Sequence, residues 1–297
     1  MKRRIVDAHH HLWDLDACCY PWLIEKGVKR FFGDPAAIQK NYLVDDLRSD
    51  ASAYELEASV HIQVGVAAGD EVRETAWLEE TAGRDGLPTA IVAYCDLESP
   101  QVERTIDAHR RYSRLRGVRQ IVGRSAEEDA KTGSGALLDN PAWRDGLALL
   151  NEHGLTFDLQ LIPPQLPRAA EVMASVDGLG VALCHCGSPW DRSPSGLRDW
   201  RRGLELLAEN DRVHCKISGL AMFDHDWEID DIRPLIETCI DVFGPARCMF
   251  GSNFPVDKLH KQYGEIWKAY ERIAGELPQA DQDRLFGATA RAFYRLD

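Results

Sequence analysis

The stretch IVDAHHHLW, residues 5–13, decides how this chain is interpreted. In an extended strand successive side chains point to opposite faces, so Asp7, His9 and His11 are expected to share one face. Two residues apart on a strand, the imidazoles of His9 and His11 lie roughly 7 Å apart and can converge on one ion, water or substrate oxygen. The apolar residues at both ends of the stretch favour a buried strand over the alternative, an exposed histidine cluster or a tag remnant.

Composition and charge narrow the range of partners. The 297 residues, 44% of them hydrophobic, are enough for one large core. A formal net charge of -13 and a pI near 5.2 disfavour nucleic acid and anionic membrane surfaces as partners, because like charges repel. No run approaches the roughly 20 apolar residues of a membrane span, and no signal-peptide pattern precedes Asp7, so we expect a cytoplasmic protein. The eight cysteines are expected to be free thiols.

Apolar runs of strand length alternate with helix-period stretches along the chain. With the first strand there are about eight such runs, the number of strands in a closed parallel barrel. The pattern predicts one α/β domain over residues 1–297, a (β/α)8 TIM barrel. The connection 14–43 is long and lacks clear periodicity, so we expect a lid over an active site. The other expected strands are 58–64, 89–97, 117–122, 155–162, 180–186, 213–217 and 247–251, and the expected helices are 47–56, 71–86, 101–114, 142–153, 197–210 and 232–243, with the last helices within 258–294.

Several of these strands carry polar residues at alternate positions near their carboxyl ends. The carboxyl end of a barrel is where barrel enzymes hold their catalytic groups, so the set predicts one shared pocket. Each member alone has a plainer interpretation: the glutamines as partners of their neighbours, His61 and His214 as core histidines, Asp7 and Asp158 in structural hydrogen bonds. The polar residues are His61, Gln63, Tyr94, Asp96, Arg119, Asp158, Gln160, His185, His214, Lys216, Ser218 and Asn253.

Cys184 and Cys186 flank His185 in a spacing that is compatible with a metal site. If His185 faces the pocket, strand alternation turns both thiols toward the helix layer. We therefore predict that the two cysteines pack as small apolar groups.

Seven short segments resemble the amidohydrolase superfamily, and within it the amidohydrolase-related branch that includes sugar lactonases and pyrone dicarboxylate lactonase. They follow the family order on successive expected strands and cover nearly the whole chain. The resemblance implies a barrel hydrolase with His9, His11 and His185 at the reacting centre, and it is less specific for the substrate. The segments are VDAHHHLWD (6–14), VHIQ (60–63), GVRQIV (117–122), FDLQ (157–160), HCGSP (185–189), CKISGL (215–220) and MFGSNFPV (249–256).

The chain departs from the family pattern at three positions. Asn253 stands where the family usually has the aspartate that deprotonates water, and an amide cannot accept a proton at neutral pH. Gln160 replaces a histidine of many members and Arg119 replaces a lysine that bridges metals, which argues against two ions. Three neutral imidazoles can hold one Zn²⁺, whereas the cations Arg119 and Lys216 would weaken its binding. Some members that resemble this arrangement work without metal, so the sequence leaves open one divalent ion or none.

The leading hypothesis is hydrolysis of a small lactone, either a sugar-acid or an aromatic-derived cyclic ester. The three histidines would polarise the scissile carbonyl or carry the metal, and Asn253 would orient the water. Its proton would pass to His185, to Asp257 or to the loop 223–227. Asp257 and His225 have a plainer interpretation as solvated residues at the rim.

Substrate binding is assigned to basic, amide and aromatic side chains. Arg119 and Lys216, with Arg124 as a further candidate, would hold a carboxylate or carbonyl of an anionic or polyhydroxylated substrate. Besides this small molecule no partner is expected, and the sequence does not define an oligomeric state. The other expected substrate-binding residues are Gln63, Gln160, Trp13, Trp190 and Phe254.

Two rival functions remain. The first is a metal-dependent decarboxylase or C–C hydrolase of the same superfamily, which would need a firm metal site. The second is a catalytically silent barrel that binds a small molecule, motivated by Asn253. Turnover of lactones separates the leading hypothesis from both rivals.

Overall fold

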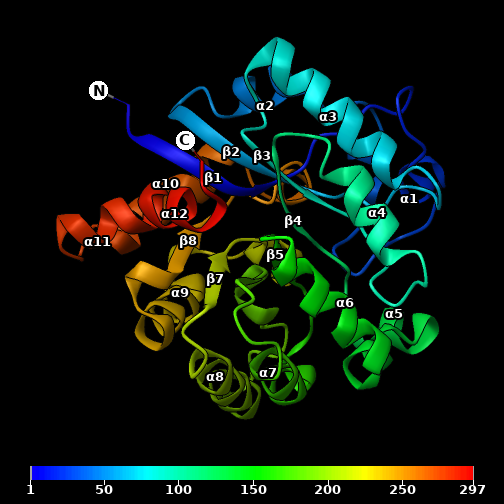
Figure 1. The fold of residues 1–297 in the computed structure, drawn as a ribbon. Coiled ribbons are helices and arrows are strands. Elements are labelled where there is room, and N and C mark those ends of the chain that lie inside the picture. The colour runs from blue at the N-terminus through cyan, green and yellow to red at the C-terminus, as the bar shows by residue number, and fades with distance from the viewer. Residues whose placement is uncertain (1, 297) are drawn as a thin grey trace.

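The protein is a barrel of eight parallel strands in sequential order. A computed structural model describes residues 2–296, and Figure 1 shows the helices arranged around the strands. The predicted (β/α)8 barrel is confirmed. The strands are β1 (Arg4–His10), β2 (Glu55–Ile62), β3 (Ala90–Ala93), β4 (Leu115–Val118), β5 (Thr156–Leu159), β6 (Val181–Leu183), β7 (Val213–Ile217) and β8 (Cys248–Phe250).

The first and last strands meet just beyond the strand ends. The backbone N–H of Asn253 donates to the His9 carbonyl at 2.8 Å, and that of His11 donates to the Phe254 carbonyl at 2.7 Å. These bonds place the segment after β8 beside the histidines of β1. The N-terminal motif and the family motif near residue 253 therefore lie side by side.

Helices follow nearly every strand, and local sequence explains their limits. In α8, Ser193 caps the N-terminus by accepting from the Gly196 N–H, and Pro194 occupies the first helical position. One face buries Trp200 and Leu204 against the barrel. The helices are α1 (Pro21–Ile24), α2 (Val44–Asp50), α3 (Glu71–Asp85), α4 (Val102–His109), α5 (Ala126–Thr132), α6 (Pro141–Glu152), α7 (Leu166–Ala174), α8 (Pro194–Ala208), α9 (Ile229–Phe243), α10 (Tyr263–Ala274), α11 (Gln279–Asp283) and α12 (Thr289–Tyr294).

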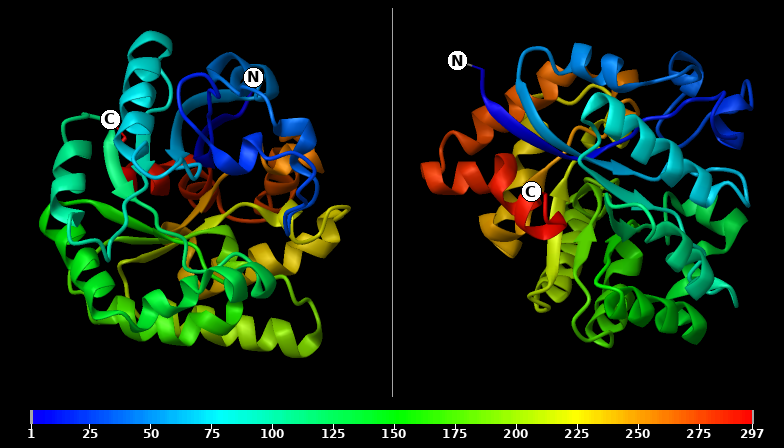
Figure 2. Two further views of the ribbon diagram at one scale, coloured as in Figure 1. Left: turned by 90° about the vertical axis from the view of Figure 1, so that its right-hand side faces the viewer. Right: turned by 45° about the horizontal axis from the view of Figure 1, so that its top comes forward.

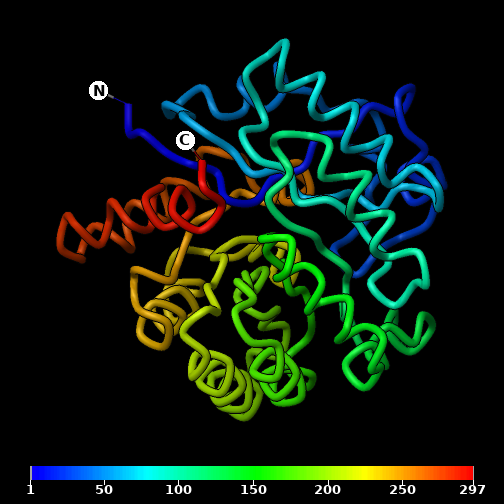
Figure 3. Tube along the Cα trace, in the orientation of Figure 1, coloured from blue at the N-terminus to red at the C-terminus, as the bar shows by residue number. Residues whose placement is uncertain are grey.

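The barrel interior at the amino ends of the strands is a packed core. Side chains from the strands enclose Tyr294 of α12, which is fully buried and donates to Asp158 at 2.8 Å. Figure 3 shows the last helix beside the first strand. This packing leaves the carboxyl end for a cavity. The interior side chains from the strands include Val6, Ala8, Val60, Ile62, Val92, Ala182 and Met249.

Several elements end earlier than the sequence predicts. The expected helix 47–56 is wrong: α2 ends at Asp50, and β2 starts at Glu55. Strands β3, β4 and β5 are also shorter than expected, so Arg119 and Gln160 lie just beyond them. Beyond the end of β4, the backbone makes one more hydrogen bond to the neighbouring strand β3: the Arg119 N–H donates to the Ala93 carbonyl at 2.8 Å. The polar side chains therefore stand at the barrel mouth.

The segment 14–43 is tied across the mouth at several points. Trp13 and Tyr42 exchange backbone hydrogen bonds of 3.0 Å at its two ends. Phe31 stacks on Phe223 of the loop after β7, and the ring of His260, after β8, contacts the Phe32 carbonyl at 2.7 Å. Figure 2 (left) shows this blue segment beside the yellow and orange segments. Its function as a lid remains a prediction.

Two expectations from composition can be compared with the structure. All eight cysteines are free thiols, as predicted. Within residues 2–296, no helix has the length and apolar character that crossing a membrane requires.

Candidate active site

A cavity of about 720 Å³ opens at the carboxyl ends of the strands. Five side chains that follow different strands line it, together with His11 and Trp13 after β1. The segment 14–43 supplies the outer wall, with Trp22, Arg30, Phe31 and Phe32. The predicted shared pocket therefore exists. The five side chains are Gln63, Arg119, Gln160, His185 and Asn253.

His11 and His185 line this cavity, and His9 lies buried against both of them. The ring centroids of His9 and His11 are 5.2 Å apart, and those of His9 and His185 are 4.4 Å apart. Burial is the main cause that lowers the pKa of all three, to about 3 for His11. The rings are therefore neutral at physiological pH and keep a lone pair for a ligand.

His11 and Asn253 face each other as two acceptors. Nδ1 of His11 lies 2.7 Å from the Ile62 carbonyl, which requires the ring proton on Nδ1 and leaves a lone pair on Nε2. Asn253 donates from Nδ2 to Asp257 at 2.7 Å, which turns its amide oxygen toward that Nε2, 3.4 Å away. Two facing lone pairs are stable only with a donor or a cation between them. The geometry therefore favours a water or a metal ion here.

Asp257 is placed behind Asn253. Its carboxyl group is buried, accepts from Asn253 and from the Ala221 N–H at 3.3 Å, and does not line the cavity. Burial raises the pKa of Asp257 to about 7. Asp257 thus orients Asn253 and is no solvated rim residue.

Arg119 is held in a fixed orientation at the cavity wall. Nη1 donates to the Gln160 oxygen at 2.8 Å, and Nη2 donates to the Gln63 backbone carbonyl at 2.6 Å. These two bonds use two of the five N–H donors of a guanidinium. The remaining donors can bind a substrate oxygen.

Comparison with known proteins identifies the family. The amidohydrolase family model matches residues 6–296. The chain belongs to the amidohydrolase family. An L-fucono-1,5-lactonase of Burkholderia multivorans is 32% identical over 303 residues, which cover 98% of this chain and 96% of the relative. An uncharacterized protein of Sinorhizobium fredii is 38% identical over 294 residues, 98% of each chain. An amidohydrolase structure from Burkholderia multivorans with bound zinc has a TM-score of 0.83 at 31% identity, over 99% of each chain.

Three residues predicted to bind substrate in this amidohydrolase do not reach the cavity. Lys216 is fully buried in an ion pair with Asp158, at 2.5 Å, because its strand position faces the barrel interior. Trp190, on the loop after β6, is 48% exposed to solvent. Phe254 is fully buried against Tyr263. The structure thus corrects their expected placement.

Strand alternation also fails around His185. The chain leaves β6 after Leu183, and His185 and Cys186 have φ of 53° and 55°. Cys186 packs in the helix layer as predicted, but the prediction for Cys184 is wrong. Its thiol lies 3.9 Å from the Asp158 carboxylate inside the barrel.

Ser218, which was expected in the shared pocket, and two further residues hold the site in place through contacts that the sequence does not predict. The hydroxyl oxygen of Ser218 lies 3.0 Å from Nδ1 of His185. Ser252 and Tyr263 donate to Asp7, which is thus structural, as one interpretation expected. A serine after a strand gives no distinctive signal, whereas the aromatic residues of 14–43 could have indicated the outer wall.

The three histidines of this amidohydrolase are neutral imidazoles, which are suitable ligands for one divalent cation. Both ring nitrogens of His9 are buried and have no hydrogen-bond partner in the described part of the chain. Asp158 and Cys184 also lie near His9, but both Asp158 oxygens are already bonded, to Lys216 and Tyr294. The ion pair with Asp158 neutralises the charge of Lys216, so Lys216 no longer disfavours a cation at this site. His9, His11 and His185 are therefore the candidate ligands by their chemistry, although their ring nitrogens do not all lie within 4.8 Å of one another.

Proposed function

We propose that this amidohydrolase opens the ring of a small lactone by attack of water on its carbonyl carbon. The proposal rests on one cavity lined by His11, His185, Asn253 and Arg119, with the neutral imidazole of His9 packed against those of His11 and His185. The 32% identity to the L-fucono-1,5-lactonase over nearly the whole chain supports a lactone rather than another substrate class. The products would be one hydroxy acid per lactone: the ring C–O bond breaks, and the ring oxygen leaves as a hydroxyl group.

The chain's own side chains would bind and orient the reactants. Arg119 would donate to the carbonyl oxygen, whose negative charge grows in the transition state. The amide oxygen of Asn253 would accept from the attacking water, and Asp257 would keep this oxygen pointed into the site. His9, His11 and His185 would hold one divalent ion such as Zn²⁺. When bound, it supplies a Lewis acid and a water of pKa about 7, so no carboxylate needs to contact that water.

A lactone panel tests the proposal directly. Sugar lactones and aromatic-derived lactones are offered to the purified protein, with and without a chelator, and proton release is measured. We expect turnover of at least one lactone, a metal content near one ion per chain by elemental analysis, and loss of turnover after chelation. No turnover with any lactone, alongside tight binding of one, would identify a binding protein instead. Full turnover without metal would disprove the metal site while leaving the lactonase proposal intact.

Asn253→Asp is expected to create a coupled pair of carboxyl groups. The Asn253 amide nitrogen lies 2.7 Å from Asp257, so two carboxyl groups at this distance must share a proton. The variant should gain a transition above pH 7 in its kcat/KM profile, and its zinc affinity should rise about tenfold because a negative charge faces His11.

The control for this prediction is the charge exchange Asn253→Asp with Asp257→Asn. It keeps one carboxylate and one amide, so the added transition should disappear. Identical profiles for the single and the double variant would contradict the coupling. Activity seen only in the Asn253→Asp protein would mean that the natural chain is a silenced hydrolase.

A further inference from the structure

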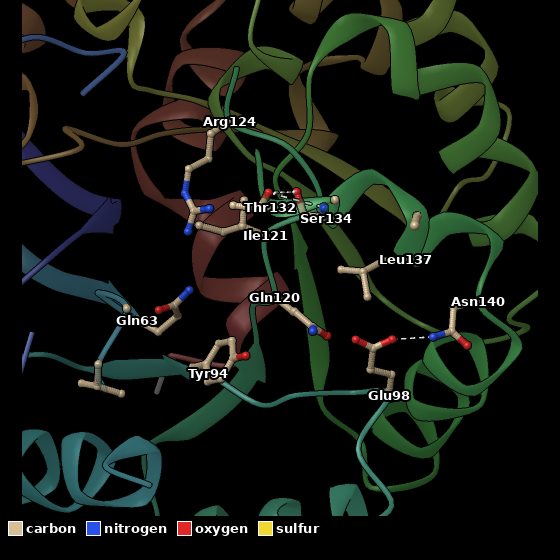
Figure 4. A pocket seen from close by; sticks show the side chains of 14 residues that line it. Gln63, Tyr94, Glu98, Gln120, Ile121, Arg124, Thr132, Ser134, Leu137 and Asn140 are labelled. Carbon is tan, nitrogen blue, oxygen red and sulfur yellow. Dashed lines mark hydrogen bonds between the residues drawn. The ribbon is translucent and has the colours of Figure 1, made fainter. Parts of the chain in front are cut away.

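A second cavity, of about 350 Å³, adjoins the first. The two cavities have a common boundary of five residues that line both. Figure 4 shows the second cavity with Arg124 at one end and Glu98 and Asn140 at the other. The proposed function uses groups of the first cavity and assigns no role to the second. The common residues are Gln63, Gly65, Ile121, Arg124 and Thr132.

Most polar groups of the second cavity are already satisfied by the protein. Glu98 accepts from the Asn140 amide. The Gln120 oxygen accepts from the Leu97 N–H at 3.0 Å and from the Trp143 indole at 2.9 Å. These bonds fix the far wall, and they leave its side chains little capacity for a ligand.

Arg124 and Tyr94 differ from this wall. Within residues 2–296, neither side chain makes a hydrogen bond or an ion pair. Burial raises the pKa of Tyr94 to about 12, so its hydroxyl group remains a donor at neutral pH. Beside them the Gln63 side-chain oxygen is buried without a partner. The unused groups therefore lie together at the common boundary, where Figure 4 shows Arg124 directed toward Gln63.

The surroundings of Arg124 make it suited to an anion. The nearest carboxylates, those of Glu128 and Asp129, act on it only through their charge. Asp129 accepts from the backbone N–H of Arg124 at 2.9 Å, and Glu128 accepts from the Phe31 N–H at 3.4 Å. A guanidinium whose planar fork is free inside a cavity matches a carboxylate, which it can bind through two parallel hydrogen bonds.

We propose that the second cavity is a subsite for a carboxylate-bearing arm of the lactone, with Arg124 as the residue that sets this specificity. The inference rests on the proposed function and narrows its substrate class. The lactone ring would lie in the first cavity near the histidines, and its arm would pass Arg124, with a hydroxyl group of the arm facing Gln63 and Tyr94. The preferred substrates are then monolactones of dicarboxylic acids, not neutral sugar lactones.

The test compares two lactones that differ in one group. D-Galactaro-1,4-lactone carries a carboxylate where D-galactono-1,4-lactone carries a hydroxymethyl group. We expect the natural protein to prefer the acidic lactone at least tenfold in kcat/KM. Arg124→Gln should lower kcat/KM for the acidic lactone about 100-fold and change that for the neutral lactone less than threefold. Arg124→Lys should fall between, because an ammonium cannot form the paired bonds.

Arg168→Gln is the matched control. Arg168 is an exposed arginine of α7 that pairs with Asp139 and Glu171 and lines neither cavity, so its replacement should alter kcat/KM for neither lactone. Equal loss for both lactones in Arg124→Gln, or a natural preference for the neutral lactone, would overturn the subsite. If neither lactone is hydrolysed, the wider lactone panel decides the proposed function separately. Calorimetric titration with galactarate then decides the subsite: binding lost in Arg124→Gln supports it, and equal binding in both proteins refutes it.

Discussion

His9→Leu is expected to lower kcat/KM for the lactone about 1000-fold while leaving thermal stability unchanged or higher. His9 is fully buried, and neither of its ring nitrogens has a hydrogen-bond partner among residues 2–296. A buried polar atom without a partner costs about 1–3 kcal/mol, so an apolar side chain of similar size removes a cost. Both ring nitrogens of His10 also lack partners, but His10 packs against His61, whereas His9 packs against His11 and His185, where a ligand can use its free nitrogen. We therefore expect activity and stability to change in opposite directions in metal-free protein.

His109→Leu is the matched control, because it replaces another buried histidine. Its two ring nitrogens contact the Thr75 hydroxyl group at 2.8 Å and the Tyr94 carbonyl at 3.0 Å. Leucine would leave both partners unsatisfied, so we expect a loss of about 2–3 kcal/mol in the free energy of unfolding. Denaturant titration and kinetics on both variants give the comparison. If His9→Leu keeps activity within tenfold and destabilises as much as the control, His9 is structural and the proposed site is wrong.

Lys216→Met is expected to destabilise the protein by about 3–5 kcal/mol, which lowers Tm by roughly 10 °C. The ammonium group of Lys216 lies 2.5 Å from Asp158 and 4.8 Å from the centroid of the Tyr294 ring, and both ionic side chains are fully inaccessible to solvent. Methionine would leave an uncompensated carboxylate in the barrel interior. The large effect follows from removing one partner, because an ion pair as a whole contributes far less.

The double variant Lys216→Met with Asp158→Leu tests this explanation. With both charges gone, most of the lost stability should return. The folded single variant, assayed well below its Tm, should keep its KM within about threefold, because Lys216 does not line the cavity. A large rise in KM without loss of stability would instead restore the direct substrate contact that the sequence predicts.

The barrel and the centre of its site were predictable from local pattern. Eight apolar runs separated by helical periods define a parallel barrel, because each strand needs a crossover to reach its neighbour. Residues that follow strands directly, such as Gln63, Arg119 and Asn253, then had to meet at the mouth, since all parallel strands end there. These inferences need only the order and spacing of residues along the chain.

What the sequence by itself determined about this protein is therefore the fold and the ring of polar residues at one end of the barrel. Only the tertiary structure decided how deep each side chain lies and what it contacts. Arg119 and Lys216 are both cations near strand ends, yet one lines the cavity and the other neutralises Asp158 beneath it. The second cavity likewise depends on how the loops after the neighbouring strands β2, β3 and β4 pack together. The physical reason is that alternation fixes the side of a strand only within its hydrogen-bonded length, whereas depth and contacts depend on residues distant in sequence.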